Sequence, residues 1–175
     1  MMDLMHRWTA ADLQRFCADA DDVRPQRYHM HAPWSRGERT YATNGHILVH
    51  VPRLAEVPEN AKAAPDAENL LERTKTGEWL LVPETEMPPD VPCSWCEGSG
   101  KDPSYRRYKC SECKGKKTQP DYLARTVIGP ATFANRYLAL IRDWEIAPTD
   151  RVSAARILCG DAEGLLMPMK NPSFE

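Results

Sequence analysis

The chain has 175 residues, of which 42% are hydrophobic and 27% are charged. This length fits one domain with a small satellite module, and the composition is too apolar for a wholly disordered chain. Its apolar runs, such as residues 165–169, are far too short to span a bilayer. The first eight residues lack the basic and apolar stretches of a secretory signal, so we expect a cytoplasmic protein.

The charges are distributed unevenly along the chain, although the net charge is only −2. Residues 53–92 carry nine acidic and four basic side chains, whereas residues 93–117 carry seven basic and three acidic ones. Four thiolates and a zinc ion would leave the second segment with a surplus of about +2. This mild basic patch makes nucleic acid a candidate partner for residues 93–117, but not for the whole surface.

The N-terminal region carries the signals of a helix followed by strands. Thr9 and Asp12 form the pattern of a capping box, which predicts a helix that begins at Ala10. The apolar stripe of this helix consists of Leu13, Phe16, Cys17 and Ala20. Residues 27–32 alternate as a strand does. Residues 39–43 and 46–51 flank an Asn-Gly pair at positions 44 and 45, which predicts a β-hairpin.

The remaining elements are predicted in the order strand, helix, strands. Residues 52–92 read as a proline-rich acidic linker with a short helix at 67–73 and a strand at 78–82. A strand at 122–128 precedes a helix that Thr132 caps and Pro148 ends, with an apolar stripe of Phe133, Tyr137, Leu140, Ile141 and Trp144. Strands at 152–158 and 165–169 close the chain, joined by a turn at Gly160-Asp161. This order predicts an α+β fold with two similar halves, each a helix plus strands.

Four of the six cysteines form two C-x-x-C pairs with thirteen residues between them, namely Cys93, Cys96, Cys110 and Cys113. Two thiolates separated by two residues can occupy adjacent corners of a tetrahedron, so the pairs predict one structural zinc ion. The site would hold a module at residues 93–117 that is inserted into a main domain formed by residues 1–92 and 118–175. Free thiols and a redox-active dithiol are the alternatives.

Glycines follow each cysteine pair and produce the repeats C-x-x-C-x-G-x-G and C-x-x-C-x-G-x-K. These repeats resemble half of the four-repeat zinc finger of DnaJ-type chaperones. Trp95 lies between two of the expected ligands, so it is either an exposed anchor for a partner or a side chain packed on the main domain.

Residues 41–48 read Y-A-T-N-G-H-I-L, and residues 164–170 read G-L-L-M-P-M-K. These two segments are similar to the hairpin A-T-D-G-H-R-L and the strand V-V-M-P-M-R of the bacterial DNA sliding clamp, the β subunit of the replicative polymerase. Residues 127–141 also resemble a clamp strand and helix. Asn44 and Ile47 depart from the pattern, and the linker and the cysteine segment are foreign to it.

The resemblance implies a single clamp-like domain and a cleft that takes up short linear peptides, with a possible place in DNA replication. The implied cleft residues are Thr43, Gly45, His46, Leu48, Met167, Pro168 and Met169. Leu48 and Met167 are equally explained as core residues of strands. A clamp ring needs six such domains and basic helices, and the expected helices here are not basic, so we do not expect a working ring.

Three functions follow from the sequence. The first is a non-enzymatic, zinc-containing interaction protein that binds a protein partner. The second is a nucleic-acid-binding protein that contacts phosphates through Arg106, Arg107, Lys109, Lys114, Lys116 and Lys117. The third is a metal-dependent enzyme that uses His29 and His31, which would share one face of a strand. No Ser–His–Asp order or phosphate-binding glycine loop is present, so we expect no enzymatic activity. The sequence predicts no oligomeric state.

Overall fold

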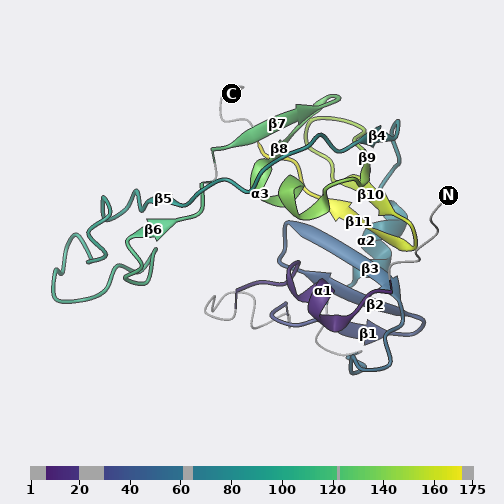
Figure 1. The fold of residues 1–175 in the computed structure, drawn as a ribbon, viewed down its shortest axis with the longest axis horizontal. Helices are drawn as coiled ribbons and strands as arrows, with labels where there is room; N and C mark the ends of the chain where they lie inside the picture. Colours follow the sequence, from purple (N-terminus) through teal and green to yellow (C-terminus); the bar gives the residue numbers. More distant parts are fainter. Residues whose placement is uncertain (1–6, 20–29, 61–64, 122, 171–175) are drawn as a thin grey trace.

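The computed structural model describes residues 7–19, 30–60, 65–121 and 123–170 (Figure 1). Its main feature is one antiparallel sheet of seven strands in the order β1-β2-β3-β11-β10-β9-β4. In that order the strands are Trp34–Arg36, Arg39–Thr43, Ile47–Pro52, Ala162–Leu166, Ala155–Cys159, Glu145–Ala147 and Leu80–Leu81.

Two small sheets and a few short helices complete the described structure. One small sheet pairs β5 (Val91–Pro92) with β6 (Thr118–Gln119), and the other pairs β7 (Arg125–Ile128) with β8 (Ala131–Ala134). The helical segments are α1 (Ala10–Gln14), α2 (Ala67–Arg73), α3 (Asn135–Leu138) and the 3₁₀ helix η2 (Ala139–Ile141). None of the described helices is long and apolar enough to cross a membrane.

The two ends of the chain meet in the middle of the large sheet, where β3 pairs with β11 and Leu48 lies opposite Leu165. Side chains alternate between the two faces along each strand. Val49 and Val51 of β3 therefore join the larger apolar core, whereas Leu48 joins a smaller one on the opposite face. The almost continuous burial of β3 follows from this, because both of its faces are covered.

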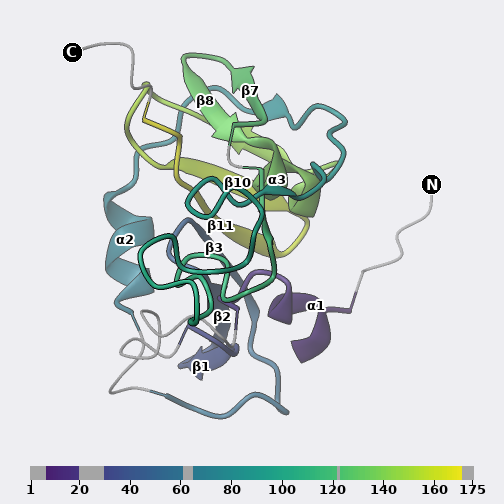
Figure 2. The same cartoon turned by 90° about the vertical axis from the view of Figure 1, so that its left-hand side faces the viewer.

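Different elements cover the two faces of the sheet, and Figure 2 shows α1 and α2 on opposite sides of it. On the larger core, Trp144 packs against Trp8 and Phe16 with ring centroids 5.9 and 6.0 Å apart. On the other face, Leu71 of α2 packs in the smaller core, where the rings of Trp34 and Tyr41 stack at 5.7 Å.

Local signals in the sequence predicted several elements correctly. The capping box at Thr9 and Asp12 is present, α2 spans residues 67–73, and the hairpin of residues 39–51 is formed by β2 and β3. The hairpin loop differs from a two-residue turn, because only Gly45 has a positive φ (91°). The Asn44 side chain instead accepts hydrogen bonds from the backbone N–H groups of residues 46 and 47 at 2.9 and 3.1 Å.

The predicted α+β fold with two similar helix-plus-strands halves is wrong, and so is the expected clamp-like domain. The part of the chain that the structure describes is mostly β, with 30% of its residues in strands and 13% in helices. Phe133 and Ala134, predicted to begin the second helix, instead belong to β8, which pairs with β7 and buries Phe133 in the larger core. The helical segment that follows stops before Asp143, whose φ of 62° is incompatible with an α-helix. At the N-terminus, α1 ends at Gln14 and is therefore shorter than the predicted stripe.

Other boundaries shifted by a few residues. The strands predicted at 78–82, 122–128, 152–158 and 165–169 occur at 80–81, 125–128, 155–159 and 162–166. The turn at Gly160-Asp161 does join β10 to β11. The predicted strand at 27–32 falls mostly outside the described residues, as do Ala20, His29 and Tyr122.

Candidate metal centre

The cysteines lie in a segment that extends away from the seven-stranded sheet, which we call the arm (residues 91–119; Figure 1). The pairing of β5 with β6 forms its base. Beyond this base, residues 93–100 and 110–117 form two turns, and residues 101–109 form a loop between them. The arm therefore leaves and rejoins the rest of the chain at one point.

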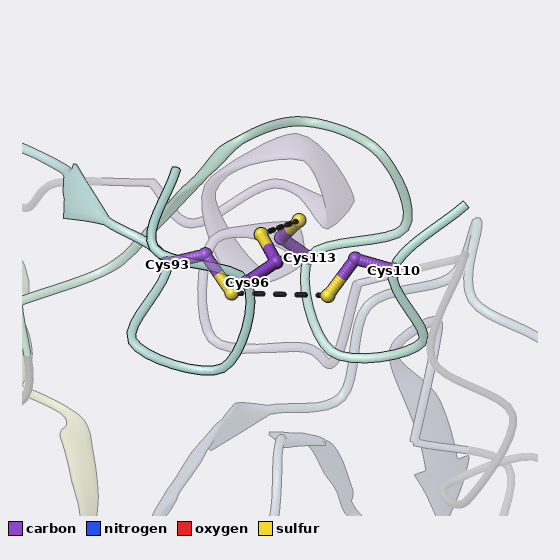
Figure 3. Close-up of side chains that lie close together, drawn as sticks. All are labelled: Cys93, Cys96, Cys110 and Cys113. Atoms are coloured by element: carbon purple, nitrogen blue, oxygen red, sulfur yellow. Dashed lines mark hydrogen bonds between the residues drawn. The ribbon is translucent and has the colours of Figure 1, made fainter. Parts of the chain in front are cut away.

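The four thiols converge between the two turns, as Figure 3 shows. All four Sγ atoms lie within 4.8 Å of one another, and all four residues are buried. The Sγ atoms of Cys93 and Cys110 are 3.9 Å apart, and those of Cys96 and Cys113 are 3.7 Å apart. A tetrahedron with metal–sulfur bonds of about 2.3 Å has sulfur atoms about 3.8 Å apart. The thiols are thus placed as metal ligands, at nearly twice the separation of about 2.0 Å in a disulfide.

The two turns share one backbone conformation, repeated at an interval of 17 residues. Glu97 and Lys114 have φ values of 50° and 51°, and Gly98 and Gly115 have φ values of 76° and 85°. Two successive residues with positive φ curl the chain around the thiols, and glycine accepts this conformation without the steric cost that other residues carry.

Hydrogen bonds between the turns follow the same repeat. The N–H of Cys93 donates to the carbonyl of Lys117 at 2.9 Å, and the N–H of Cys110 donates to the carbonyl of Gly100 at 3.0 Å. Each turn thereby fixes the first cysteine of the other, which indicates an approximate two-fold arrangement around the ligand position.

The environment of the thiols favours a negative charge on one of them. Burial alone would raise the pKa of Cys96, but the Gly100 N–H, 3.2 Å from its Sγ, and the three neighbouring thiols lower that pKa to about 6. Burial raises the pKa of Cys110 to about 11, and the thiols of Cys96 and Cys113 add to this effect. Four thiolates cannot coexist in this space without a cation, because like charges at these distances repel strongly.

The residues therefore fit a metal ion with four sulfur ligands, and the four buried cysteines can bind one. Within the part of the chain that the structure describes, no other group of three His, Cys, Asp or Glu side chains has this geometry. His31 belongs to no such group, and His29 lies outside the described residues. The hypothesis of a second metal at these histidines gains no support.

The side chains proposed as surface contacts on the arm are exposed. Trp95 is 57% exposed and does not pack into either core. The six basic residues proposed to contact phosphates are all exposed. Lys116 also lies 3.9 Å from Asp19, an exposed pair that contributes little to stability.

Two exposed tyrosines of the arm were missed in the sequence, although they flank Arg106-Arg107. Tyr105 is 65% and Tyr108 is 54% exposed. Their placement between the two cysteine pairs was the available signal, because a loop closed by metal ligands has no core in which to bury an aromatic ring.

The structure also brings together the two segments that resemble the sliding clamp. The N–H of Met167 donates to the carbonyl of His46 at 2.9 Å, and the His46 ring stacks on Tyr137 at 5.6 Å. Met167 is 44% exposed, whereas Leu48 and Thr43 are buried. Gly45 is exposed, and Pro168 and Met169 are half-buried.

A polar pocket of about 310 Å³ lies on the face of the sheet that α2 covers, and nothing in the sequence pointed to it. It is lined by Arg39, Tyr41, His50, Glu68, Leu71, Glu72, Arg156 and Glu163. None of the cleft residues implied by the clamp resemblance lines this pocket.

His50, one of the residues that line this pocket, is buried. Arg39 Nη1 lies 2.7 Å from Nδ1 and 2.9 Å from Nε2 of its ring. A guanidinium can only donate, so the ring nitrogen that accepts from it carries no proton. Burial and the charge of Arg39 lower the pKa of His50 to about 4, although the carboxylate of Glu163, 3.8 Å away, opposes this. The imidazole is therefore neutral near pH 7.

The two cysteines outside the arm have the properties of structural thiols. Burial raises the pKa of Cys17 to about 12, and burial with the charges of Asp143 and Asp161 raises the pKa of Cys159. Thiols of this kind are poor nucleophiles near neutral pH.

Comparisons of the chain with protein-family models, with curated proteins and with solved structures give no match.

Proposed function

We propose that the four cysteines bind one structural zinc ion, and that the arm held by this ion binds nucleic acid in a protein that is not an enzyme. Thiolate ligands select soft or borderline metals, and four thiolates in a tetrahedron are typical of structural zinc. Four ligands fill the coordination shell and leave no position for a substrate, which favours a structural role.

Zinc would supply most of the folding free energy of the arm. The buried apolar cluster within the arm consists of the cysteines themselves, and the base of the arm is a sheet of only two short strands. Such a segment buries too little apolar surface to offset the conformational entropy that folding removes. Metal binding that is coupled to folding closes this gap.

The observation that carries the nucleic-acid proposal is the exposure of the basic side chains on an arm that stands apart from the sheet (Figure 1). Only three of the 25 acidic residues lie in residues 93–117, whereas nine lie in residues 53–92. An arm of this kind can reach phosphates without bringing most of the acidic surface close to them. Contacts with phosphates release counterions, so the affinity should fall steeply as salt is added.

Binding to labelled DNA and RNA over a range of salt concentrations tests the proposal. If all six basic residues contact phosphates, the slope of log K against log salt should be about −4 for a single strand. The double variant Arg106→Ala/Arg107→Ala should make that slope shallower by about 1.4, because it removes two of the six contacts. Lys75→Ala is the matched control, because Lys75 is also exposed but lies outside the arm. Absence of binding at low salt, or equal binding by the arginine variant and the control, contradicts the proposal.

A second candidate function is the binding of a short peptide from a protein partner beside residues 43–48 and 167–169. The observation that favours it is that these two segments lie together and leave Met167 exposed. Capture of partners from the native host, with Met167→Ala and Trp95→Ala as variants, separates the two candidates. A partner that is lost with Met167→Ala but kept with Trp95→Ala would bind beside residues 43–48 and 167–169 and not to the arm.

A further inference from the structure

The loop at residues 101–109 is held in a defined shape by its own backbone. Lys101 and Lys109 form an antiparallel bridge, and the N–H of Asp102 donates to the carbonyl of Tyr108 at 3.1 Å. The Asp102 carboxylate accepts hydrogen bonds from the N–H groups of residues 104 and 105 at 2.8 and 2.9 Å. These bonds fix the loop without an apolar core, which leaves its side chains free to face the solvent.

The rings of Tyr105 and Tyr108 form a small aromatic surface on this loop. Their centroids are 6.4 Å apart at an interplanar angle of 70°, and the guanidinium carbon of Arg107 lies 4.7 Å from the centroid of the Tyr108 ring. The rings pack on each other and on an arginine, and both remain more than half exposed. Neither tyrosine ring belongs to the two apolar cores of the seven-stranded sheet.

We propose that Tyr105, Arg107 and Tyr108 form a stacking platform for the bases of single-stranded nucleic acid. This inference rests on the proposed function, and it adds that the arm prefers a single strand to a duplex. An exposed ring or guanidinium plane can stack only on a base whose face is free, and bases in a duplex already stack on their neighbours. Base stacking on aromatic rings does not depend strongly on sequence, so the platform should accept many sequences.

The basic side chains on the same loop also favour binding of a single strand. Lys101 and Lys109 form the base of the loop, and Arg106 lies between the two tyrosines. Proteins that bind single strands combine a basic surface along the backbone with rings that take successive bases. The loop supplies both within nine residues, whereas Trp95 offers a further exposed ring elsewhere on the arm.

The test compares the affinities of zinc-loaded protein for a labelled oligothymidylate and for a duplex of the same length, at low salt. Tyr108→Leu should weaken binding of the single strand by about 5- to 150-fold and leave duplex binding unchanged. Tyr108→Phe is the matched control and should keep the single-strand affinity, because it keeps the ring. Tyr105→Leu should behave like Tyr108→Leu. The zinc content of each variant should equal that of the parent, which shows that the arm has folded.

The outcomes separate this inference from the proposed function. Equal affinity for single strand and duplex, with no loss in Tyr108→Leu, overturns the stacking platform but leaves phosphate binding by the arm intact. Loss of affinity for both ligands in Tyr108→Leu also overturns it, because stacking would affect only the single strand. Failure of the parent protein to bind either ligand overturns both proposals together.

Discussion

Lowering the pH from 7 to 4 should destabilise the seven-stranded sheet through protonation of His50. The imidazole is buried on the face of the sheet that α2 covers, with Arg39, Arg156 and Glu163 as its charged neighbours. Its ordinary pKa is 6.5, and burial together with Arg39 lowers the folded-state pKa to about 4. Between these two values the unfolded chain binds a proton that the folded protein does not.

The sign and size of the effect follow from this difference. Stability rises with pH wherever the unfolded state binds more protons. The contribution of His50 is therefore complete above about pH 6.5 and is lost as the pH falls toward 4. At about 1.4 kcal/mol for each pH unit, the loss at pH 4 is at most about 3 kcal/mol.

Urea unfolding measured at a series of pH values tests this magnitude. His50→Gln is the useful variant, because a glutamine oxygen can still accept a hydrogen bond from Arg39 but the side chain does not titrate. The carboxylates and any bound metal are common to the parent and the variant, so their effects on the pH dependence of the free energy of unfolding cancel in the comparison. The difference between their free energies of unfolding should change by about 2–3 kcal/mol between pH 7 and pH 4. Parallel curves for the two proteins would contradict a lowered pKa of His50, and so would a free energy of unfolding of the parent that rises as the pH falls.

Three further predictions concern the sheet, the arm and the half-buried thiol of Cys17. Gly164→Ala should lower the free energy of unfolding by more than about 2 kcal/mol, because a Cβ there would overlap the Leu48 carbonyl in the neighbouring strand. Gly160→Ala is the control, because Gly160 has open space around it. Its φ of 60° should make this substitution cost only about 1 kcal/mol. Equal losses in urea unfolding would contradict this. A zinc chelator should make the amides of the arm exchange rapidly with solvent while those of the large sheet stay protected, and loss of protection in both would show that the sheet depends on the metal. Cys17 should resist alkylation at pH 7 in the folded protein, since partial burial raises its pKa to about 12, and rapid modification would contradict this raised pKa.

The sequence alone predicted those features of the structure that depend on local contacts. Thr9 and Asp12 are three residues apart, and the Asn44-Gly45 loop closes on residues that follow it directly. The metal site was predictable for the same reason, because each pair of cysteines is set by one turn and soft ligands leave few alternatives.

The sequence alone did not predict those features that depend on contacts between residues far apart in the chain. The stripe of Phe133 and Tyr137 fits a helix, but pairing with β7 makes residues 131–134 a strand. The pairing of β3 with β11 and the polar pocket depend on contacts between residues more than a hundred positions apart, such as His50 and Glu163. No periodicity within a short window carries this information.

Both proposals for the arm require that its four cysteines bind a zinc ion. Metal analysis of freshly purified protein should find about one zinc per chain, and the double variant Cys96→Ser/Cys113→Ser should lose it while the large sheet remains folded. Less than about half an equivalent of zinc in the parent protein, or an equal amount in the variant, would contradict a structural zinc ion at these four cysteines.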